Sequence, residues 1–251
     1  MDSLEVATWN VLHRIHAENW GEEPARRFPD ECVRIAAIAE RIAALLERGA
    51  RVIALQEVSG DQLARLRAAL PPSAQVLTLR YPRVPKHRIG AIAHTALHDP
   101  TEHLVTVVAA GAGARELAAS AFHDDHGKGF LAIELEDGTT LVNAHITYGD
   151  KRPGQLGRIA DLADERTGAV LLLGDFNADA ATVATTLGSP FSFAVPTQPS
   201  LPTRPRTSGS KSQTIDHILT LRAASTACTV LDAAGLSDHN PVTATIHLPE
   251  R

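Results

Sequence analysis

Short apolar runs recur along this chain, and several of them end abruptly in polar residues. One run, at 170–173, leads directly into Gly-Asp-Phe-Asn at 174–177. An apolar run of this length is typical of a central strand that is buried on both faces. Asp175 and Asn177 would therefore emerge at the carboxyl end of the strand, where open α/β sheets hold their ligands. If the extended geometry persists, alternation places both side chains on one side.

Four further segments repeat this pattern of a strand that ends in polar residues. They are 4–9 followed by Asn10, 52–56 followed by Glu57, 140–144 followed by His145, and Ile215 followed by Asp216 and His217. Another polar motif, Ser-Asp-His-Asn-Pro at 237–241, precedes a strand predicted at 242–248. The combined set holds carboxylates, amides and imidazoles, with no cysteine. This repetition makes chance a poor explanation.

Helical spacing and turn signals place further elements between these strands. Asp30 can cap a helix that extends to about residue 48, and Gly49 supplies the stop. Further helices are predicted at 61–70, 155–165 and 178–187, further strands at 75–79, 89–94, 103–109, 130–136 and 140–145, and a long loop at 196–212. Asp137-Gly138 is a hairpin signal between the last two strands. This order of strands and helices indicates an α/β fold.

Composition agrees with an α/β fold and sets limits. The chain has 251 residues and a mass of 26.8 kDa, which suits one large domain or two small ones. We expect a single domain over residues 1–251, because the polar motifs are spread over the whole length and no linker divides them. Hydrophobic residues make up 44%, enough for a substantial core, but only 4% of residues are aromatic. Stacking platforms for bases should therefore be scarce.

The net charge limits the classes of binding partner that we expect, and the cysteine content bears on the cellular compartment. The net charge of −5 is unusual for a tight, non-specific binder of duplex DNA, although basic stretches occur at 80–88 and around Arg204, Arg206 and Lys211. A small phosphorylated molecule, a nucleotide or a short single strand fits this balance better. Two cysteines are too few for a disulfide framework, and the start lacks the regions of a secretory signal. With no apolar run near the roughly 20 residues that cross a bilayer, we expect a cytoplasmic protein without a membrane partner.

The polar motifs indicate a metal and a phosphate ligand. Oxygen ligands without thiolates suit Mg²⁺ or Mn²⁺, and neighbouring amides and imidazoles suit an oxyanion such as phosphate. At these residues the chain resembles the endonuclease/exonuclease/phosphatase family of metal-dependent phosphoesterases. The resemblance runs in family order from Trp9-Asn10 to Ser237-Asp238-His239. It implies a four-layer α/β sandwich, in which two packed mixed sheets are flanked by helices.

The resemblance also implies a role for each motif residue. One divalent metal would be held by Glu57 with Asn10 nearby, and Asp238 is a candidate ligand for a second metal. Asp175 would orient or deprotonate the attacking water. Hydrogen bonds to the phosphate oxygens would come from Asn177, His145 and His239, with Asp216 holding the His239 imidazole. Arg204 and Arg206, on the long loop, would meet phosphate groups beyond the scissile one.

Simpler interpretations exist for some of these residues and for their neighbours. Asn10 suits a turn after a strand, and Asn177 suits the cap of the helix predicted at 178–187. His217 should point away from Asp216 in an extended segment and is not expected to be catalytic. The roles of His13, His16 and Trp20 stay open, because these residues can line the substrate pocket or pack locally. The run 123–126 looks like a metal site, but it is better explained as an exposed loop between strands.

Departures from subfamily patterns narrow the function. Leu12 stands where apurinic endonucleases carry an acid, and Ile215 and His217 flank Asp216 where inositol-polyphosphate phosphatases show Cys-Asp-Arg. We therefore expect a Mg²⁺-dependent phosphoesterase that hydrolyses a phosphodiester in a nucleotide or single-stranded nucleic acid. The alternatives are a phosphomonoesterase acting on a small phosphorylated metabolite and a catalytically silent phosphate-binding module.

Overall fold

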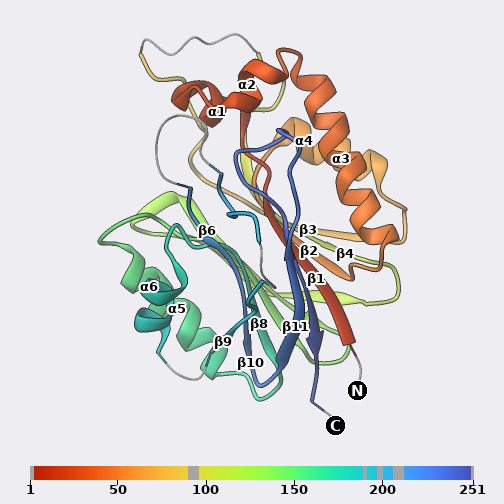
Figure 1. The fold of residues 1–251 in the computed structure, drawn as a ribbon, viewed down its shortest axis with the longest axis vertical. Coiled ribbons are helices and arrows are strands. Elements are labelled where there is room, and N and C mark those ends of the chain that lie inside the picture. Colours follow the sequence, from red (N-terminus) through yellow and green to blue (C-terminus); the bar gives the residue numbers. More distant parts are fainter. Residues whose placement is uncertain (1–2, 90–95, 189–190, 197–199, 206–211, 250–251) are drawn as a thin grey trace.

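Two mixed sheets pack face to face, and helices cover their outer faces (Figure 1). The computed structural model describes residues 3–89, 96–188, 191–196, 200–205 and 212–249. The fold is the four-layer α/β sandwich that the resemblance implies. None of the helices in these ranges is long and apolar enough to cross a membrane.

The first sheet brings two sequence motifs together through its one parallel pair. Its strand order is β11 (Ala224–Val230), β12 (Val242–His247), β1 (Ser3–Asn10), β2 (Val52–Ser59), β4 (Glu102–Val108) and β3 (Gln75–Arg80). Strands β1 and β2 are parallel, and Asn10 pairs in register with Gln56. Because the carboxyl ends of parallel neighbours lie at the same sheet edge, Asn10 and Glu57 end on one side of the sandwich.

The second sheet has the same arrangement around its own parallel pair. Its strand order is β5 (Ala114–Phe122), β6 (Asp125–Leu135), β7 (Thr140–His145), β8 (Val170–Asp175), β10 (Asp216–Leu221) and β9 (Ser192–Phe193). Strands β7 and β8 are parallel, with His145 opposite Asp175. Strand β10 is antiparallel to β8 and begins where β8 ends, so Asp216 also lies opposite Asp175.

The helices and three apolar clusters complete the layers. The helices are α1 (Arg14–Trp20), α2 (Glu23–Arg27), α3 (Glu31–Glu47), α4 (Gly60–Ala69), α5 (Arg152–Asp164) and α6 (Ala180–Leu187). One cluster fills the space between the sheets and includes Leu4 and Leu171. Another joins the first sheet to α3 and α4, and a third joins the second sheet to α5 and α6.

Local signals located both ends of α3 and α4 correctly. Asp30 accepts a hydrogen bond from the Cys32 amide, and Ser59 and Gln62 form a reciprocal capping box at the start of α4. The predicted helices at 30–48 and 61–70 are therefore present to within a residue or so. The expected cap at Asn177 is wrong, because α6 begins later and Asp179 caps it by accepting from the Thr182 amide.

Other strand predictions agree less well. Strand β6 begins at Asp125, earlier than expected. The run 123–126 lies at the turn between β5 and β6, as expected for a loop between strands. Strands β5, β9 and β11 and helices α1 and α2 were not predicted. The strand predicted at 89–94 lies almost wholly outside the described residues.

A polar bridge crosses the apolar space between the sheets just below the site. The Asn143 amide on β7 donates to the carbonyls of Leu55 (3.2 Å) and Val105 (2.9 Å) in the first sheet. Its oxygen accepts from Gln56 Nε2 at 2.9 Å. Buried amides must find such partners, so the bridge sets how the two sheets align. Gln56 directly precedes Glu57, so the bridge also helps to fix where Glu57 lies relative to the second sheet.

A buried arginine on α3 ties together two loops that carry site residues. Arg34 is fully buried and pairs with Glu31 at 2.6 Å. Its guanidinium also donates to the carbonyls of Leu12 and Leu236, both at 2.8 Å, and of Val11 at 3.0 Å. These carbonyls belong to the loop after β1 and the loop that precedes the 237–241 motif.

We expect Arg34→Met to lower the free energy of unfolding by about 3 kcal/mol or more, since it leaves the buried Glu31 carboxylate with only the longer Arg14 contact at 3.3 Å and removes the donor from three carbonyls. Urea denaturation monitored by circular dichroism measures this difference. Arg41→Met is the matched control, because Arg41 lies on the same helix and makes an exposed hydrogen bond to the Asp232 carbonyl. Equal stabilities of the two variants would contradict the assigned role of Arg34.

Candidate active site

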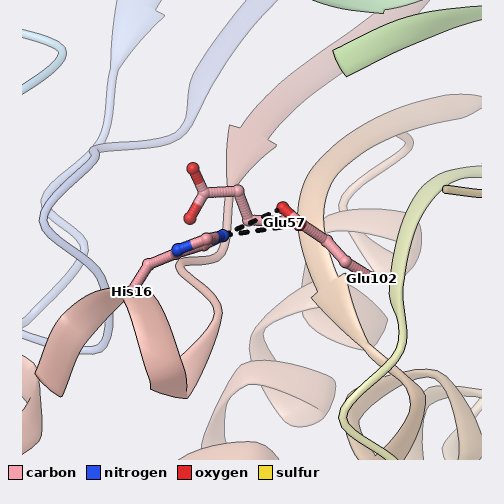
Figure 2. Close-up of side chains that lie close together, drawn as sticks. All are labelled: His16, Glu57 and Glu102. Atoms are coloured by element: carbon pink, nitrogen blue, oxygen red, sulfur yellow. Dashed lines mark hydrogen bonds and ion pairs between the residues drawn. The ribbon is translucent and has the colours of Figure 1, made fainter. Parts of the chain in front are cut away.

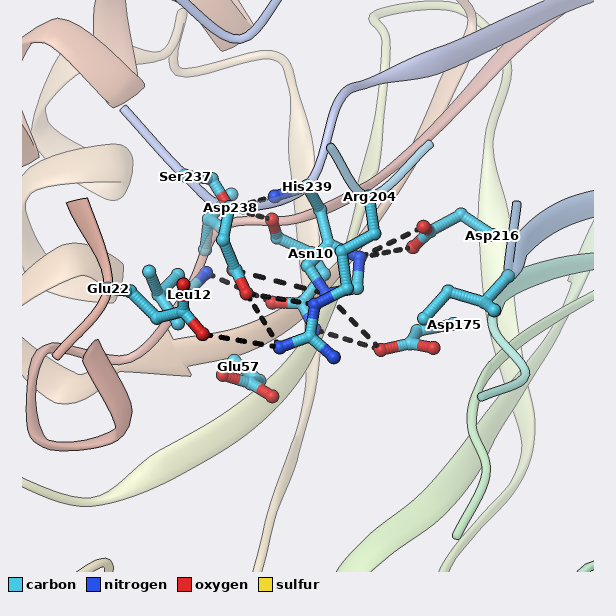
Figure 3. A network of polar contacts seen from close by, with 12 residues as sticks. Asn10, Leu12, Glu22, Glu57, Asp175, Arg204, Asp216, Ser237, Asp238 and His239 are labelled. Atoms are coloured by element: carbon cyan, nitrogen blue, oxygen red, sulfur yellow. Dashed lines mark hydrogen bonds and ion pairs between the residues drawn. The ribbon is translucent and has the colours of Figure 1, made fainter. Parts of the chain in front are cut away.

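Polar side chains from both sheets converge at the end of the sandwich where the two parallel pairs terminate (Figure 3). The structure brings together nearly all the sequence-predicted residues that it describes: Asn10, Glu57, His145, Asp175, Asp216, Asp238 and His239. Their distances and burial indicate what each can do.

The acid and imidazole pair suggested by the family pattern is present. His239 Nδ1 lies 2.9 and 3.0 Å from the two carboxylate oxygens of Asp216. The ring is 3% exposed, and its backbone carbonyl accepts from the Trp9 indole at 2.9 Å. Burial alone lowers the pKa of His239, but the carboxylates of Asp216 and Asp238 outweigh it and raise this pKa to about 10. The ring is thus held in its protonated, donating form at neutral pH.

Asp175 is the carboxylate on which the other groups converge. Its Oδ2 accepts from Asn10 Nδ2 at 3.1 Å and lies 3.4 Å from His145 Nε2 and 3.9 Å from His239 Nε2. Burial raises the pKa of Asp175, yet the hydrogen bond from His145 and the charge of His239 outweigh it and hold this pKa below its usual range. Asp175 therefore stays ionised while buried.

Asn177 lies beside Asp175 but does not follow the alternation expected from an extended strand. Strand β8 ends at Asp175, and Asn177 has a φ of 48°, in the left-handed region that asparagine tolerates. Its amide N–H donates to Asp175 Oδ1 at 2.9 Å, and its side chain donates to the Ile146 carbonyl at 2.9 Å. The expectation that both side chains simply share one side of a strand is wrong, because the chain turns after Asp175.

Glu57 stands on a strained bulge. Its φ is 56°, unusual for a residue other than glycine, and the β2–β4 register shifts between Leu55 and Val58. The carboxylate accepts from the His13 amide at 3.3 Å and lies 3.8 Å from His145 Nε2. Burial raises the pKa of Glu57, but nearby cations, His16 and Lys128 foremost, outweigh it and keep the pKa below its usual range.

Lys128 is a site residue that the sequence did not indicate. It lies on β6, and its Nζ contacts both nitrogens of the His145 ring. Burial is the largest influence on the pKa values of Glu57 and Asp175, and it raises them. The charge of Lys128 is one of the effects that lower both pKa values. Lys128 stands inside a strand and ends no apolar run, so only the β6–β7 pairing brings it to the site.

Arg204 and Asp238 bind each other. Oδ2 of Asp238 accepts from Arg204 Nη2 at 2.8 Å and from Nε at 3.0 Å, and Glu22 lies 3.8 Å from the same guanidinium. Arg204 is expected from the sequence to meet remote phosphates and Asp238 to bind a second metal; in this structure the two side chains pair with each other. Arg206 lies outside the described residues.

The structure also separates the neighbouring histidines. His217 points away from the site and contacts Phe176, Phe193 and the Ala178 carbonyl, as expected. His13 packs locally: it is fully buried, and its ring accepts from the Ile15 amide at the start of α1. His16, by contrast, faces Glu57 and Glu102.

The donor set fits a divalent cation. Glu57 is ionised, and the Asn10 amide oxygen, which accepts from the Leu12 amide at 3.0 Å, keeps a second lone pair. Among the described residues, Oδ1 of Asp238 and Oε1 of Glu102 are buried carboxylate oxygens with no hydrogen-bond partner. Such oxygens suit Mg²⁺ or Mn²⁺.

Solved structures show the same fold at low sequence identity. An endonuclease/exonuclease/phosphatase from Bacteroides vulgatus is 17% identical, with a TM-score of 0.70 and coverage of 99% of this chain and 100% of that chain. Humanized D. rerio TDP2 carrying 14 mutations is 14% identical, with a TM-score of 0.68 and coverage of 98% and 99%. D. rerio TDP2 complexed with a single strand DNA product is also 14% identical, with a TM-score of 0.68 and coverage of 98% and 100%.

Sequence comparison agrees with the likeness in fold. No curated protein matches the sequence. The model of the Endonuclease/Exonuclease/phosphatase family, however, matches residues 7–239, which is most of the chain. The protein belongs to the endonuclease/exonuclease/phosphatase family.

Proposed function

We propose that the protein is a metal-dependent phosphodiesterase that hydrolyses a phosphodiester bond in a single-stranded nucleic acid or nucleotide by in-line attack of water. The observation that carries this proposal is the geometry of His239. Its Nδ1 is held by Asp216 at 2.9 Å, while its Nε2 faces the ionised Asp175 across 3.9 Å. The His239 ring, as donor, and the Asp175 carboxylate, as acceptor, thus lie side by side at the edge where both sheets end.

The residues divide the chemistry between acceptor and donor roles. Asp175 accepts a hydrogen bond from the attacking water and takes its proton as the new P–O bond forms and the bond between phosphorus and the leaving oxygen breaks. His239 donates to a non-bridging oxygen, where negative charge grows in the transition state. His145, which lies 3.4 Å from Asp175, and Lys128, which contacts His145, are proposed as further donors. Asn177 is proposed as another donor; in this structure its side-chain amide donates to the Ile146 carbonyl.

Glu57 and Asn10 are the proposed metal ligands. A bound Mg²⁺ or Mn²⁺ would neutralise charge on a phosphate oxygen and on the leaving oxygen. Asp238 is the proposed ligand of a second ion, through the oxygen that Arg204 does not contact. Arg204 and Arg206 are the proposed contacts for phosphates beyond the scissile one, and Arg204 must then release part of its pairing with Asp238.

Two exposed aromatic side chains favour a substrate with bases. Trp20 is 58% exposed and lies at the end of α1, the helix that carries His16; the Arg88 guanidinium lies 3.6 Å from its ring centroid. Tyr148 is 77% exposed, three residues after His145, with Arg152 5.5 Å from its ring. Aromatic and guanidinium surfaces of this kind stack on nucleobases without regard to sequence. The single strand DNA product bound to the D. rerio TDP2 structure supports the same substrate class.

The test compares substrates that differ only in their bases. Turnover of a short deoxythymidine oligomer is measured with Mg²⁺ and with Mn²⁺ against an abasic oligomer with the same number of phosphates. We expect Trp20→Ala and Tyr148→Ala each to raise KM for the thymidine oligomer several-fold, because stacking contributes about 1–3 kcal/mol per base. KM for the abasic oligomer should not change.

Val33→Ala is the matched control, since Val33 is 56% exposed and lies on α3. Equal KM changes for the two oligomers would contradict base stacking. Release of phosphate from monoesters, with no cleavage of either oligomer, would favour the phosphomonoesterase alternative. Binding of the oligomers without turnover would favour the silent module.

The single-domain organisation and the cytoplasmic location remain predictions of the sequence.

A further inference from the structure

Three side chains from separate elements meet beside the proposed active site (Figure 2). His16 comes from α1, Glu57 from the bulge in β2 and Glu102 from the start of β4. His16 Nε2 lies 3.4 Å from each carboxylate oxygen of Glu102. One ligand atom from each of the three side chains can be chosen so that all lie within 4.8 Å of one another.

Two buried oxygen atoms, one in this cluster and one on Tyr81, have no hydrogen-bond partner among the described residues, and the first has only the ion pair with His16. Glu102 is 1% exposed, and its Oε1 accepts no hydrogen bond. Tyr81 is also 1% exposed, and its hydroxyl makes no hydrogen bond. Burial, followed by the carboxylates of Glu102 and Glu57, raises the pKa of Tyr81 well above its ordinary value, which places this hydroxyl in the field of the same carboxylates. Buried oxygen atoms are normally paired, so these two point to a missing ligand.

The spacing of the ligand atoms suits a metal ion. Two neighbouring atoms bound to one ion at about 2.1 Å in octahedral directions lie about 3.0 Å apart. The His16–Glu102 separation of 3.4 Å is close to this value, and a Glu57 ligand atom lies within 4.8 Å of both. The cluster combines one imidazole with two carboxylates and contains no thiolate. Such a set suits first-row transition metals better than Mg²⁺, which prefers oxygen ligands alone.

We propose that His16 and Glu102 join Glu57 in binding the catalytic metal, and that this mixed nitrogen and oxygen site takes a divalent transition metal such as Mn²⁺ in preference to Mg²⁺. The proposal rests on the proposed function only in assigning Glu57 to the metal. In the competing interpretation, His16 and Glu102 form an ion pair and the metal contacts oxygen ligands alone. The two interpretations differ in whether a histidine nitrogen is bonded to the ion.

The experiment measures metal binding without substrate. Mn²⁺ is titrated into metal-free protein by calorimetry, and the loaded sample is studied by pulsed electron paramagnetic resonance. We expect a ¹⁴N coupling from a directly bound imidazole, replaced by a ¹⁵N pattern when histidine is isotopically labelled. In His16→Gln the coupling should be lost and Mn²⁺ affinity should fall by about tenfold or more, as loss of a metal contact typically produces. Mg²⁺ affinity should fall less.

His87→Gln is the control, because His87 pairs with Glu18 at 2.7 Å, outside the cluster; its spectrum and affinity should match those of the wild type. Glu102→Gln should also weaken Mn²⁺ binding, which provides a second variant if His16→Gln does not fold. Mn²⁺ that binds wild type without any nitrogen coupling, or an unchanged coupling in His16→Gln, would overturn this inference and leave the proposed function standing. No binding of either ion would overturn both.

Discussion

His239→Ala is expected to lower kcat by a factor on the order of 10² or more, the usual scale for losing a donor to transition-state charge. The reason is the protonated ring, whose pKa is raised to about 10 by Asp216 and Asp238 against the opposing effect of burial. KM should change little, because the donor acts where charge grows during reaction. Steady-state kinetics on the thymidine oligomer measure both constants.

The same experiment tests whether Asp216 acts through His239. Asp216→Asn should lower kcat. The kcat of the double variant Asp216→Asn/His239→Ala should be no lower than that of His239→Ala alone, because Asp216 can act only by holding the His239 ring. His247→Ala is the control, because His247 lies at the far end of β12 and contacts Thr226. Near-normal kcat in His239→Ala, with the fold intact by circular dichroism, would remove His239 from the mechanism.

Chelation is expected to abolish turnover, and added Mg²⁺ or Mn²⁺ should restore it. Glu57→Gln should raise the metal concentration for half-maximal activity by about tenfold or more, because the variant loses the charged ligand on which a hard cation depends. The strained backbone at Glu57, with a φ of 56°, aims the carboxylate into the site, and we expect Glu57→Gln to keep it because the two side chains have the same shape. Activity as a function of free metal concentration measures the shift.

Glu134→Gln provides the comparison for this prediction, since Glu134 forms an exposed ion pair with Arg115 at 2.9 Å on the second sheet. Its metal dependence should equal that of the wild type. Undiminished turnover in excess chelator would show that the reaction does not need a metal. Asp175→Asn, measured alongside, should lose kcat without a change in metal dependence, which separates the water-orienting role from the metal-binding role.

Much of the site was predictable because it follows a local rule. An apolar run that stops at a polar residue marks the end of a buried strand, and Asn10, His145 and Asp175 are the last residues of β1, β7 and β8. Asp216 is instead the first residue of β10, and Glu57 lies on the bulge two residues before the end of β2. Their order and the 237–241 motif sufficed to identify the family resemblance. Helix limits were predictable for a similar reason, since caps such as Asp30 and Ser59 act within a few residues.

Other site residues carry no such local signal. Lys128 lies within β6, and His16 and Glu102 lie at the starts of ordinary elements. Their roles arise only when α1, β4 and β6 pack around the strand ends. The pairing of Arg204 with Asp238 is also tertiary, because it joins a loop to a motif 34 positions away.

The sequence by itself determined the α/β class, the strand ends and most of the acids, amides and imidazoles at them, because periodicity and capping act over short distances. Tertiary structure alone decided the directions of those side chains. The bulge at Glu57 and the left-handed Asn177 break the alternation that a strand predicts, and both conformations persist only because surrounding contacts hold them. Strand register then set which groups meet: the parallel β7–β8 pair places His145 opposite Asp175, and the antiparallel β10 places Asp216 there as well.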